Sequence, residues 1–107
     1  MILIPLSAIP NQTFSIVLDS NQYDLSVYVA TNIMAMDIIR NNIPIVLGMR
    51  MLPFYPIIPY LYLEDGNFVM STDEQGNYPY YDQFGVTQQL VYLSQTELNS
   101  LRTTGTL

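Results

Sequence analysis

The side chains best suited to chemistry in this sequence are its carboxylates. Glu64-Asp65 and Asp73-Glu74 form two acidic pairs, and Asp82 follows them. Two carboxylates, one of them with a raised pKa, are what glycoside hydrolysis requires. The chain has no His, Lys or Cys, so a Ser or Thr nucleophile has no obvious activating partner. The one catalytic class left is a carboxylate-dependent hydrolase, with Glu64 and Asp82 as its candidate residues.

A turn role explains the same acids with fewer assumptions. Glu64-Asp65 directly precedes Gly66, and Asp73-Glu74 lies close to Gly76; Asp with Gly is typical of turns for conformational reasons. Asp73, Glu74 and Asn77 offer oxygen ligands, but their spacing matches no EF-hand calcium loop. The absence of cysteine removes thiolate metal sites. The sequence therefore predicts a protein that is not an enzyme and needs no metal or cofactor.

Tyrosine is the other conspicuous residue type. The chain has nine Tyr and no Trp. Three of the tyrosines lie in a proline-fixed segment, 51–62, and three in a polar segment, 78–84. Aromatic side chains in such places suit protein interfaces, but they also suit sugar stacking or the closure of a small barrel. The candidate protein interface consists of Phe54, Tyr55, Ile57, Ile58, Tyr60, Tyr62, Tyr78, Tyr80, Tyr81 and Phe84.

Alternating apolar and polar residues predict the strands that must position these side chains. Residues 13–19 and 22–31 alternate on either side of Asp19-Ser20-Asn21, which is turn chemistry. The pattern predicts a hairpin with Phe14 and Ile16 on one face of the first strand and Leu25 and Val27 on one face of the second.

A second hairpin is expected from residues 34–40 and 43–50, which flank Asn41-Asn42. Asn tolerates the positive φ that two-residue hairpin turns require. Pro44 lacks a backbone donor, which indicates an edge strand or a strand start. Alternation would place Ile43, Ile45, Leu47 and Met49 on one face of the later strand.

The remainder predicts a third hairpin, a loop and a short C-terminal helix. Asp65-Gly66 separates residues 60–64 from 67–72, a strong hairpin signal. Residues 72–85 are expected to form a long loop, and 87–94 a last strand. Residues 96–101 would form one helical turn capped by Thr96, with a frayed tail from Arg102. The prediction is an all-β, single-domain barrel or sandwich of antiparallel hairpins over 1–107, with its core at about 3–98.

Charge and hydropathy exclude several classes of function. Only 11% of the residues are charged, against roughly 25% in an average soluble domain. The net charge is −6 with three scattered arginines, which argues against binding to nucleic acid. Residues 1–5 are too short for a signal peptide, and the apolar segment 51–63 is broken by Pro53, Pro56 and Pro59, so no membrane segment is expected. A surface so poor in charge favours burial in an assembly.

Three blocks of sequence, in this order, resemble the baseplate plug proteins of simple contractile-tailed phages such as cyanophages. The first runs from Ile4-Pro5-Leu6 through residues 10–14 to Tyr23-Asp24-Leu25, and the others are residues 58–68 (IPYLYLEDGNF) and 84–93 (FGVTQQLVYL). The likeness spans residues 3–98.

This resemblance implies a structural protein of the virion, assembled in the host cytoplasm. It would lie at the centre of the tail baseplate near the junction of tail tube and hub. It would contact tube, hub or neighbouring baseplate subunits, or further copies of itself in a ring. The resemblance implies no cofactor. A carbohydrate-binding module that uses the tyrosine-rich segment 78–84 remains the alternative.

Overall fold

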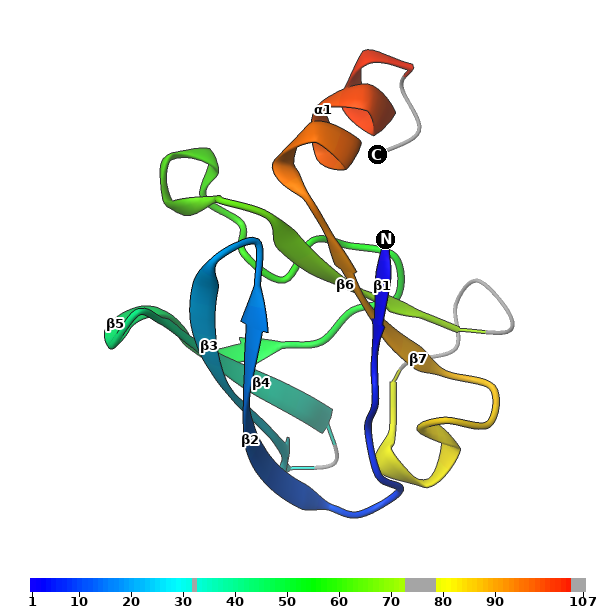
Figure 1. Ribbon diagram of the computed structural model, residues 1–107. Coiled ribbons are helices and arrows are strands. Elements are labelled where there is room, and N and C mark those ends of the chain that lie inside the picture. The colour runs from blue at the N-terminus through cyan, green and yellow to red at the C-terminus, as the bar shows by residue number, and fades with distance from the viewer. Residues whose placement is uncertain (32, 73–78, 105–107) are drawn as a thin grey trace.

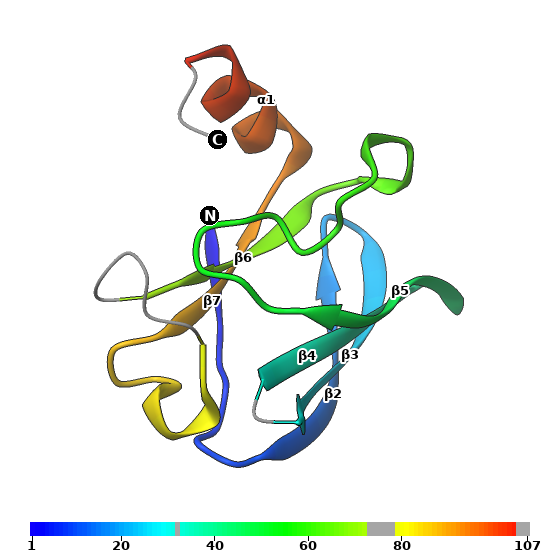
Figure 2. The same cartoon turned by 180° about the vertical axis from the view of Figure 1, so that it is seen from behind.

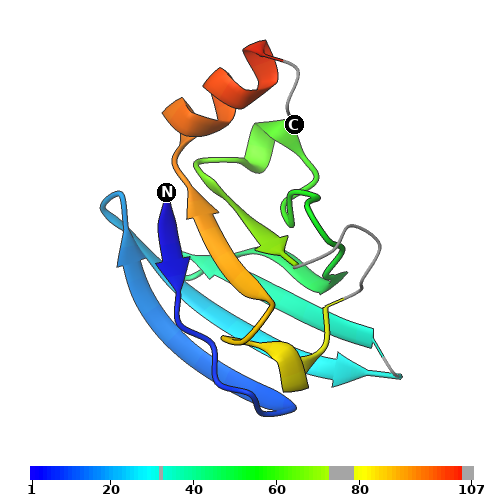
Figure 3. The same ribbon diagram turned by 90° about the vertical axis from the view of Figure 1, so that its right-hand side faces the viewer.

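The computed structural model describes residues 1–31, 33–72 and 79–104. Its strands form two antiparallel sheets, with the orders β2-β3-β4-β5 and β1-β7-β6. The smaller sheet lies across the larger one, and the helix α1 stands beyond the end of the smaller sheet (Figures 1, 2 and 3). The predicted all-β class with a short C-terminal helix is confirmed. The elements are β1 (Ile2–Ile4), β2 (Asn11–Leu18), β3 (Asn21–Ala30), β4 (Ile33–Arg40), β5 (Ile43–Arg50), η1 (Leu61–Leu63), β6 (Asn67–Ser71), η2 (Tyr81–Gln83), β7 (Gln89–Leu93) and α1 (Gln95–Thr103), where η marks a 3-10 helix.

The first predicted hairpin is confirmed as β2 and β3. Leu18 pairs with Asn21 across the two-residue turn, and Asp19 and Ser20 have φ of 50° and 66°. Positive φ at both central residues gives the turn a twist that matches the flanking strands. The predicted inner face of β3 is buried, with Leu25 and Val27 both 0% exposed.

The second predicted hairpin is also confirmed, as β4 and β5. Asn41 and Asn42 have φ of 51° and 65°, and Pro44 is the second residue of β5, an edge strand.

The predicted face of β5 is wrong. Two register shifts between β4 and β5 bury Val46 and leave Leu47 65% exposed. Each shift places one extra residue in β5, and that residue interrupts the alternation of inward and outward side chains. The carboxylate of Asp37 stabilises the irregular stretch, because it accepts hydrogen bonds from the Gly48 N–H at 2.6 Å and from the Tyr28 hydroxyl at 2.9 Å.

The third predicted hairpin is wrong. Residues 61–63 form η1 rather than a strand, and β6 pairs with β7 instead. The proline-punctuated segment follows the other edge of β6, where the Phe54 and Ile57 amides donate to Met70 and Phe68 carbonyl oxygens at 2.9 and 2.8 Å. Proline lacks the amide donor of a continuous ladder, so contact with β6 is limited to a few bridges.

Both ends of the chain carry more structure than the sequence pattern predicts. Residues 2–4 form β1, which pairs with β7. The helix runs over Gln95–Thr103, with Ser94 rather than Thr96 as its cap, since Ser94 Oγ accepts from the Glu97 amide and Glu97 accepts from the Ser94 amide. This reciprocal pair is a capping box. Fraying was expected from Arg102, but Arg102 and Thr103 still belong to the helix and Arg102 is ion-paired there. The rest of the predicted tail, residues 105–107, lies outside the described residues.

The core fills the space between the sheets and centres on three aromatic rings. The Phe68 ring meets the rings of Tyr23 and Tyr92 edge-on, with both centroid separations at 5.3 Å. The hydroxyl of Tyr92 donates to Asp19 at 2.8 Å, and that of Tyr23 donates to the Asp65 carbonyl at 2.9 Å. Each buried hydroxyl therefore has a partner, as burial of a polar group requires.

Candidate protein interface

The most exposed side chain of the predicted interface, that of Tyr62, lies in η1. Tyr60, Leu61 and Tyr62 are 50%, 72% and 83% exposed, and the two tyrosine rings lie 5.8 Å apart between centroids. We call these three residues the tyrosine tip. Exposed apolar side chains in contiguous groups mark interaction sites more often than isolated ones do.

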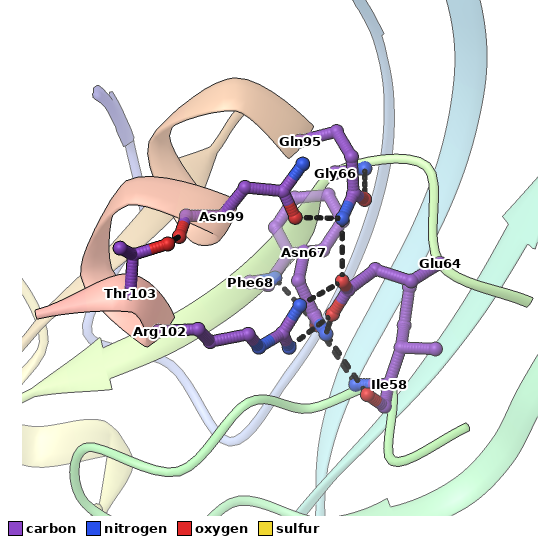
Figure 4. A network of polar contacts seen from close by, with 9 residues as sticks. All are labelled: Ile58, Glu64, Gly66, Asn67, Phe68, Gln95, Asn99, Arg102 and Thr103. Carbon is purple, nitrogen blue, oxygen red and sulfur yellow. Dashed lines mark hydrogen bonds and ion pairs between the residues drawn. The ribbon is translucent and has the colours of Figure 1, made fainter. Parts of the chain in front are cut away.

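A buried carboxylate holds the tip in place from behind. The Glu64 side chain is only 1% exposed, although it lies next to the tip in sequence. Arg102 from α1 donates to both of its oxygens, the Nη2–Oε2 distance being 2.8 Å. Asn67 and Gln95 donate to it as well. Figure 4 shows these side chains converging on Glu64 from α1 and from the start of β6. Such a bidentate, charge-assisted pair fixes geometry more firmly than a single hydrogen bond.

The same contacts decide the ionisation of Glu64. Burial raises its pKa, but hydrogen bonds from Arg102, Asn67 and Gln95 outweigh burial and leave the pKa below the ordinary value. Glu64 is therefore a charged acceptor whose contacts are supplied by the protein. Asp82, the other candidate of the hydrolase hypothesis, is exposed on η2. The geometry gives Glu64 a structural role.

Asn67 connects this network to the proline-punctuated segment. Its side chain is buried; Oδ1 accepts from the Ile58 amide at 2.9 Å and Nδ2 donates to the Ile58 carbonyl at 2.8 Å. The amide side chain thus supplies the two hydrogen bonds that a neighbouring strand would otherwise make. Pro59 follows Ile58 directly and leads into the tip.

Phe54 and Tyr55 lie on a different part of the molecule from the tip. They are 41% and 66% exposed, and Phe54 lines an apolar groove of about 360 Å³ over the outer face of the three-stranded sheet. The other apolar lining residues are Met1, Leu3, Val69, Val91, Leu93 and Leu101. Phe54 has φ of 63°, a left-handed conformation that is costly for an aromatic residue and that tends to occur at functional sites.

Three predicted interface residues belong to the core instead. Ile57, Ile58 and Phe84 are 1%, 2% and 2% exposed, so they face the sheets rather than a partner. Alternation along an irregular segment could not show this, because its backbone bends between the prolines. We therefore remove these three residues from the candidate interface.

The second predicted region is only partly accessible. The rings of Tyr80 and Tyr81 are tilted at 38° to each other with centroids 4.8 Å apart, and both side chains pack, partly buried, against the main core. Tyr78 lies outside the described residues. The structure thus separates the predicted interface into the tip, the Phe54 groove and a half-buried tyrosine pair.

Charge on the surface is predominantly negative. Asp19, Asp65 and Asp82 are exposed, whereas Arg102 is bound to Glu64 and the amino group of Met1 pairs with Glu97. Within the described residues, no three potential metal-ligating side chains gather, and no helix combines the length and apolar character of a membrane span. The accessible chemistry is that of apolar and aromatic contact on an acidic background.

Comparison with known families gives this surface a context. A family model described as the cyanophage baseplate Pam3 plug gp18 matches residues 1–96. The chain belongs to this family of baseplate plugs. No curated protein matches it. The resemblance noted in the sequence is confirmed, and membership in the plug family supports a structural role in a phage tail baseplate, in contact with other baseplate or tail proteins. It also points away from catalysis.

The plug-family match includes all the strands and the tyrosine tip, while most of α1 follows it. Sequence reasoning did not identify Leu61 or the groove over β1, β6 and β7. The available signal was the apolar residues Met1 and Leu3, but they can be recognised as one side of a groove only once β1 is paired with β7.

Proposed function

We propose that the chain is a plug at the centre of the baseplate, near the junction of tail tube and hub, and that it binds neighbouring tail proteins through the tyrosine tip. The observation that carries this proposal is the tip itself. Its side chains are exposed, and Glu64 behind it is tied to α1 and β6. A rigid apolar surface loses little conformational freedom on binding, so more of its contact energy appears as affinity.

The Phe54 groove provides a second contact surface for the same role. Its floor of Val69 and Val91 is 8% exposed at each residue, and Leu3 beside it is 56% exposed. Two separate apolar surfaces suit a subunit that lies between two neighbours. The sugar-binding alternative has less support, because Tyr80 and Tyr81 pack against the core and offer little free ring surface for stacking.

Light scattering of the purified chain, alone and mixed with the tube and hub proteins, tests the proposal. The wild-type chain should form a stable complex with at least one of them. The double variant Tyr60→Ser/Tyr62→Ser should bind about ten-fold more weakly, because aromatic residues dominate interface energy. Val86→Ser is the matched control, since Val86 is 72% exposed on another loop, and it should bind as the wild type does. A wild-type chain that remains a monomer with both proteins would contradict the proposal.

A further inference from the structure

The edges of the two sheets differ in how far they can accept another strand. An edge strand presents unpaired N–H and C=O groups, and proteins usually cover or interrupt such edges. On the smaller sheet, one edge strand, β1, is only three residues long. The other edge, that of β6, is covered by the proline-punctuated segment, whose Phe54 and Ile57 amides donate hydrogen bonds to it. Neither edge offers a long free ladder.

The β5 edge of the larger sheet is interrupted along its length. Arg40 and Ile43 flank the two-residue turn, so they form a hydrogen-bonded pair and the next residue, Pro44, points its nitrogen outward. That nitrogen carries no hydrogen. Further along, register shifts break the strand, and the Gly48 amide is bonded to Asp37.

β2 is the exception among the described strands. It is an edge strand of eight residues, Asn11–Leu18, and its sequence NQTFSIVL contains no charge, proline or glycine. Because Leu18 and Asn21 flank a two-residue turn, hydrogen-bonded pairs alternate from there. The backbone groups of Asn11, Thr13, Ser15 and Val17 therefore face away from β3. Among the described residues, the N–H and C=O groups of these four residues have no hydrogen-bond partner on the side that faces away from β3.

We propose that the free edge of β2 accepts an extended strand from another protein of the tail, which adds to the four-stranded sheet next to β2. The proposal rests on the baseplate role proposed above. Added strands bind mainly through backbone hydrogen bonds, and that is what this edge provides. The side chains of Thr13 and Ser15, which lie on the exposed face of β2, are small. The bound strand is therefore selected by backbone shape more than by side-chain pockets.

Charge identifies a different protein, rather than a second copy, as the source of the strand. The chain has a net charge of −6 and no lysine. Asp24 lies on β3 beside the edge, where it accepts from Ser15 at 2.5 Å, and Asp19 follows the end of β2. A second copy would bring the same acids to the same edge, whereas like charges in register oppose strand pairing. The occupant is therefore a strand with basic rather than acidic residues, placed near its middle beside Asp24 and near the end that lies beside Asp19.

Hydrogen–deuterium exchange at single-residue resolution tests the proposal on the wild-type chain. It compares the free chain with the same chain bound to the tube and hub proteins. The amides of Thr13, Ser15 and Val17 should exchange at least about ten-fold more slowly in the complex, as expected for newly bonded amides. Unchanged exchange at these amides, with protection only at the tip, would overturn the inference and leave the proposed function standing. Failure of the wild-type chain to enter any complex would count against the proposed function itself.

Two variants at one position separate the backbone from the side chain. Ser15→Pro removes the outward amide hydrogen, and Ser15→Ala removes the same hydroxyl contact with Asp24 but keeps the amide. Proline is tolerated at edge positions whose amide faces away from the sheet, so thermal unfolding should show both variants folded. Complex formation should fall about ten-fold for Ser15→Pro and less than about two-fold for Ser15→Ala, in line with loss of a central ladder bond.

Equal binding by the two variants would overturn the proposal. A dimer of the isolated chain would also overturn it. In that case the mass would double and the protection of the β2 amides would grow with concentration, because the occupant would be a second copy. If Ser15→Pro does not fold, the exchange experiment on the wild-type chain still decides the question.

Discussion

Gly66 lies so close to the ring of Tyr92 that a Cβ at position 66 would stand 2.1 Å from the Tyr92 hydroxyl oxygen. Gly66 also has φ of +83°, a backbone angle that residues other than glycine rarely adopt. The ring has no room to move, because Tyr92 is 1% exposed and its hydroxyl is bonded to Asp19. This contact sets the position of the turn between the tyrosine tip and β6.

Gly66→Ala should therefore destabilise the protein by roughly 3–5 kcal/mol, from backbone strain and overpacking together. Gly85→Ala is the control, since Gly85 has a similar φ of +79° but its Cβ would meet only the Leu6 carbonyl oxygen at 3.6 Å. That control should cost about 1 kcal/mol. Urea unfolding of both variants measures the difference, and equal losses would show that the Tyr92 contact is not the cause.

Removal of Arg102 should leave a buried carboxylate without its charged partner. Arg102→Ala should cost about 2 kcal/mol, less than for a fully buried ion pair because the Arg102 side chain is 29% exposed. The double variant Glu64→Gln/Arg102→Ala should recover part of the loss, because no charge then remains buried. Chemical unfolding of the single and double variants forms the test, and a double variant less stable than Arg102→Ala would contradict it.

The pKa of Glu64 predicts how stability depends on pH. Its folded-state pKa is lowered, so the unfolded chain binds the proton more readily and stability is lost as the pH falls. The loss should begin near the unfolded pKa of about 4.3 and continue through the lower folded pKa. Glu64→Gln should flatten this part of the stability curve measured by thermal unfolding between pH 6 and 2 (about the range in which carboxylates titrate).

Glu97 requires a separate control in that experiment. Its pKa is also lowered, chiefly by the hydrogen bond from the amino terminus and then by that from the Ser94 amide. Glu97→Gln should therefore remove a separate part of the stability that the wild type loses as the pH falls. A Glu64→Gln curve as steep as that of the wild type would refute the assignment of the acid sensitivity to Glu64.

Tyr62 and Tyr81 should respond differently to truncation. Tyr62 is 83% exposed, so Tyr62→Ala should change stability by less than about 0.5 kcal/mol. The Tyr81 ring contacts that of Tyr80 and packs against the core, so Tyr81→Ala should cost about 1–2 kcal/mol. Thermal unfolding of both variants compares them, and similar melting temperatures would contradict the burial difference.

The sequence predicts the parts of this fold that depend on local chemistry. Asp19-Ser20 and Asn41-Asn42 carry their own turn preference, and the strands on either side of each turn pair with one another. The prediction was wrong where a distant residue decides. The chain does bend at Asp65-Gly66, but the Asn67 side chain bonds to Ile58 and β6 takes β7 as its partner. Arg102 is ordered by a carboxylate 38 residues earlier.

Which residues of the candidate interface are exposed was predictable only in part. Residue type and proline spacing indicated segment 51–62 correctly as a source of exposed aromatic side chains. They could not show that Ile57 and Ile58 turn inward, because inward direction depends on the sheet beneath them. The open edge of β2 could not be predicted either, since strand order is set by contacts across the whole domain.

The network around Glu64 also has a mechanical consequence. A force applied at η1 passes into β6 through Asn67 and into α1 through Arg102. α1 follows β7 directly, and β6 and β7 are paired from Asn67–Leu93 to Ser71–Gln89. Both routes therefore end in adjacent strands of one sheet, where the force is shared by several hydrogen bonds at once. A load on the tip is therefore carried by the smaller sheet and α1 as well as by the loop.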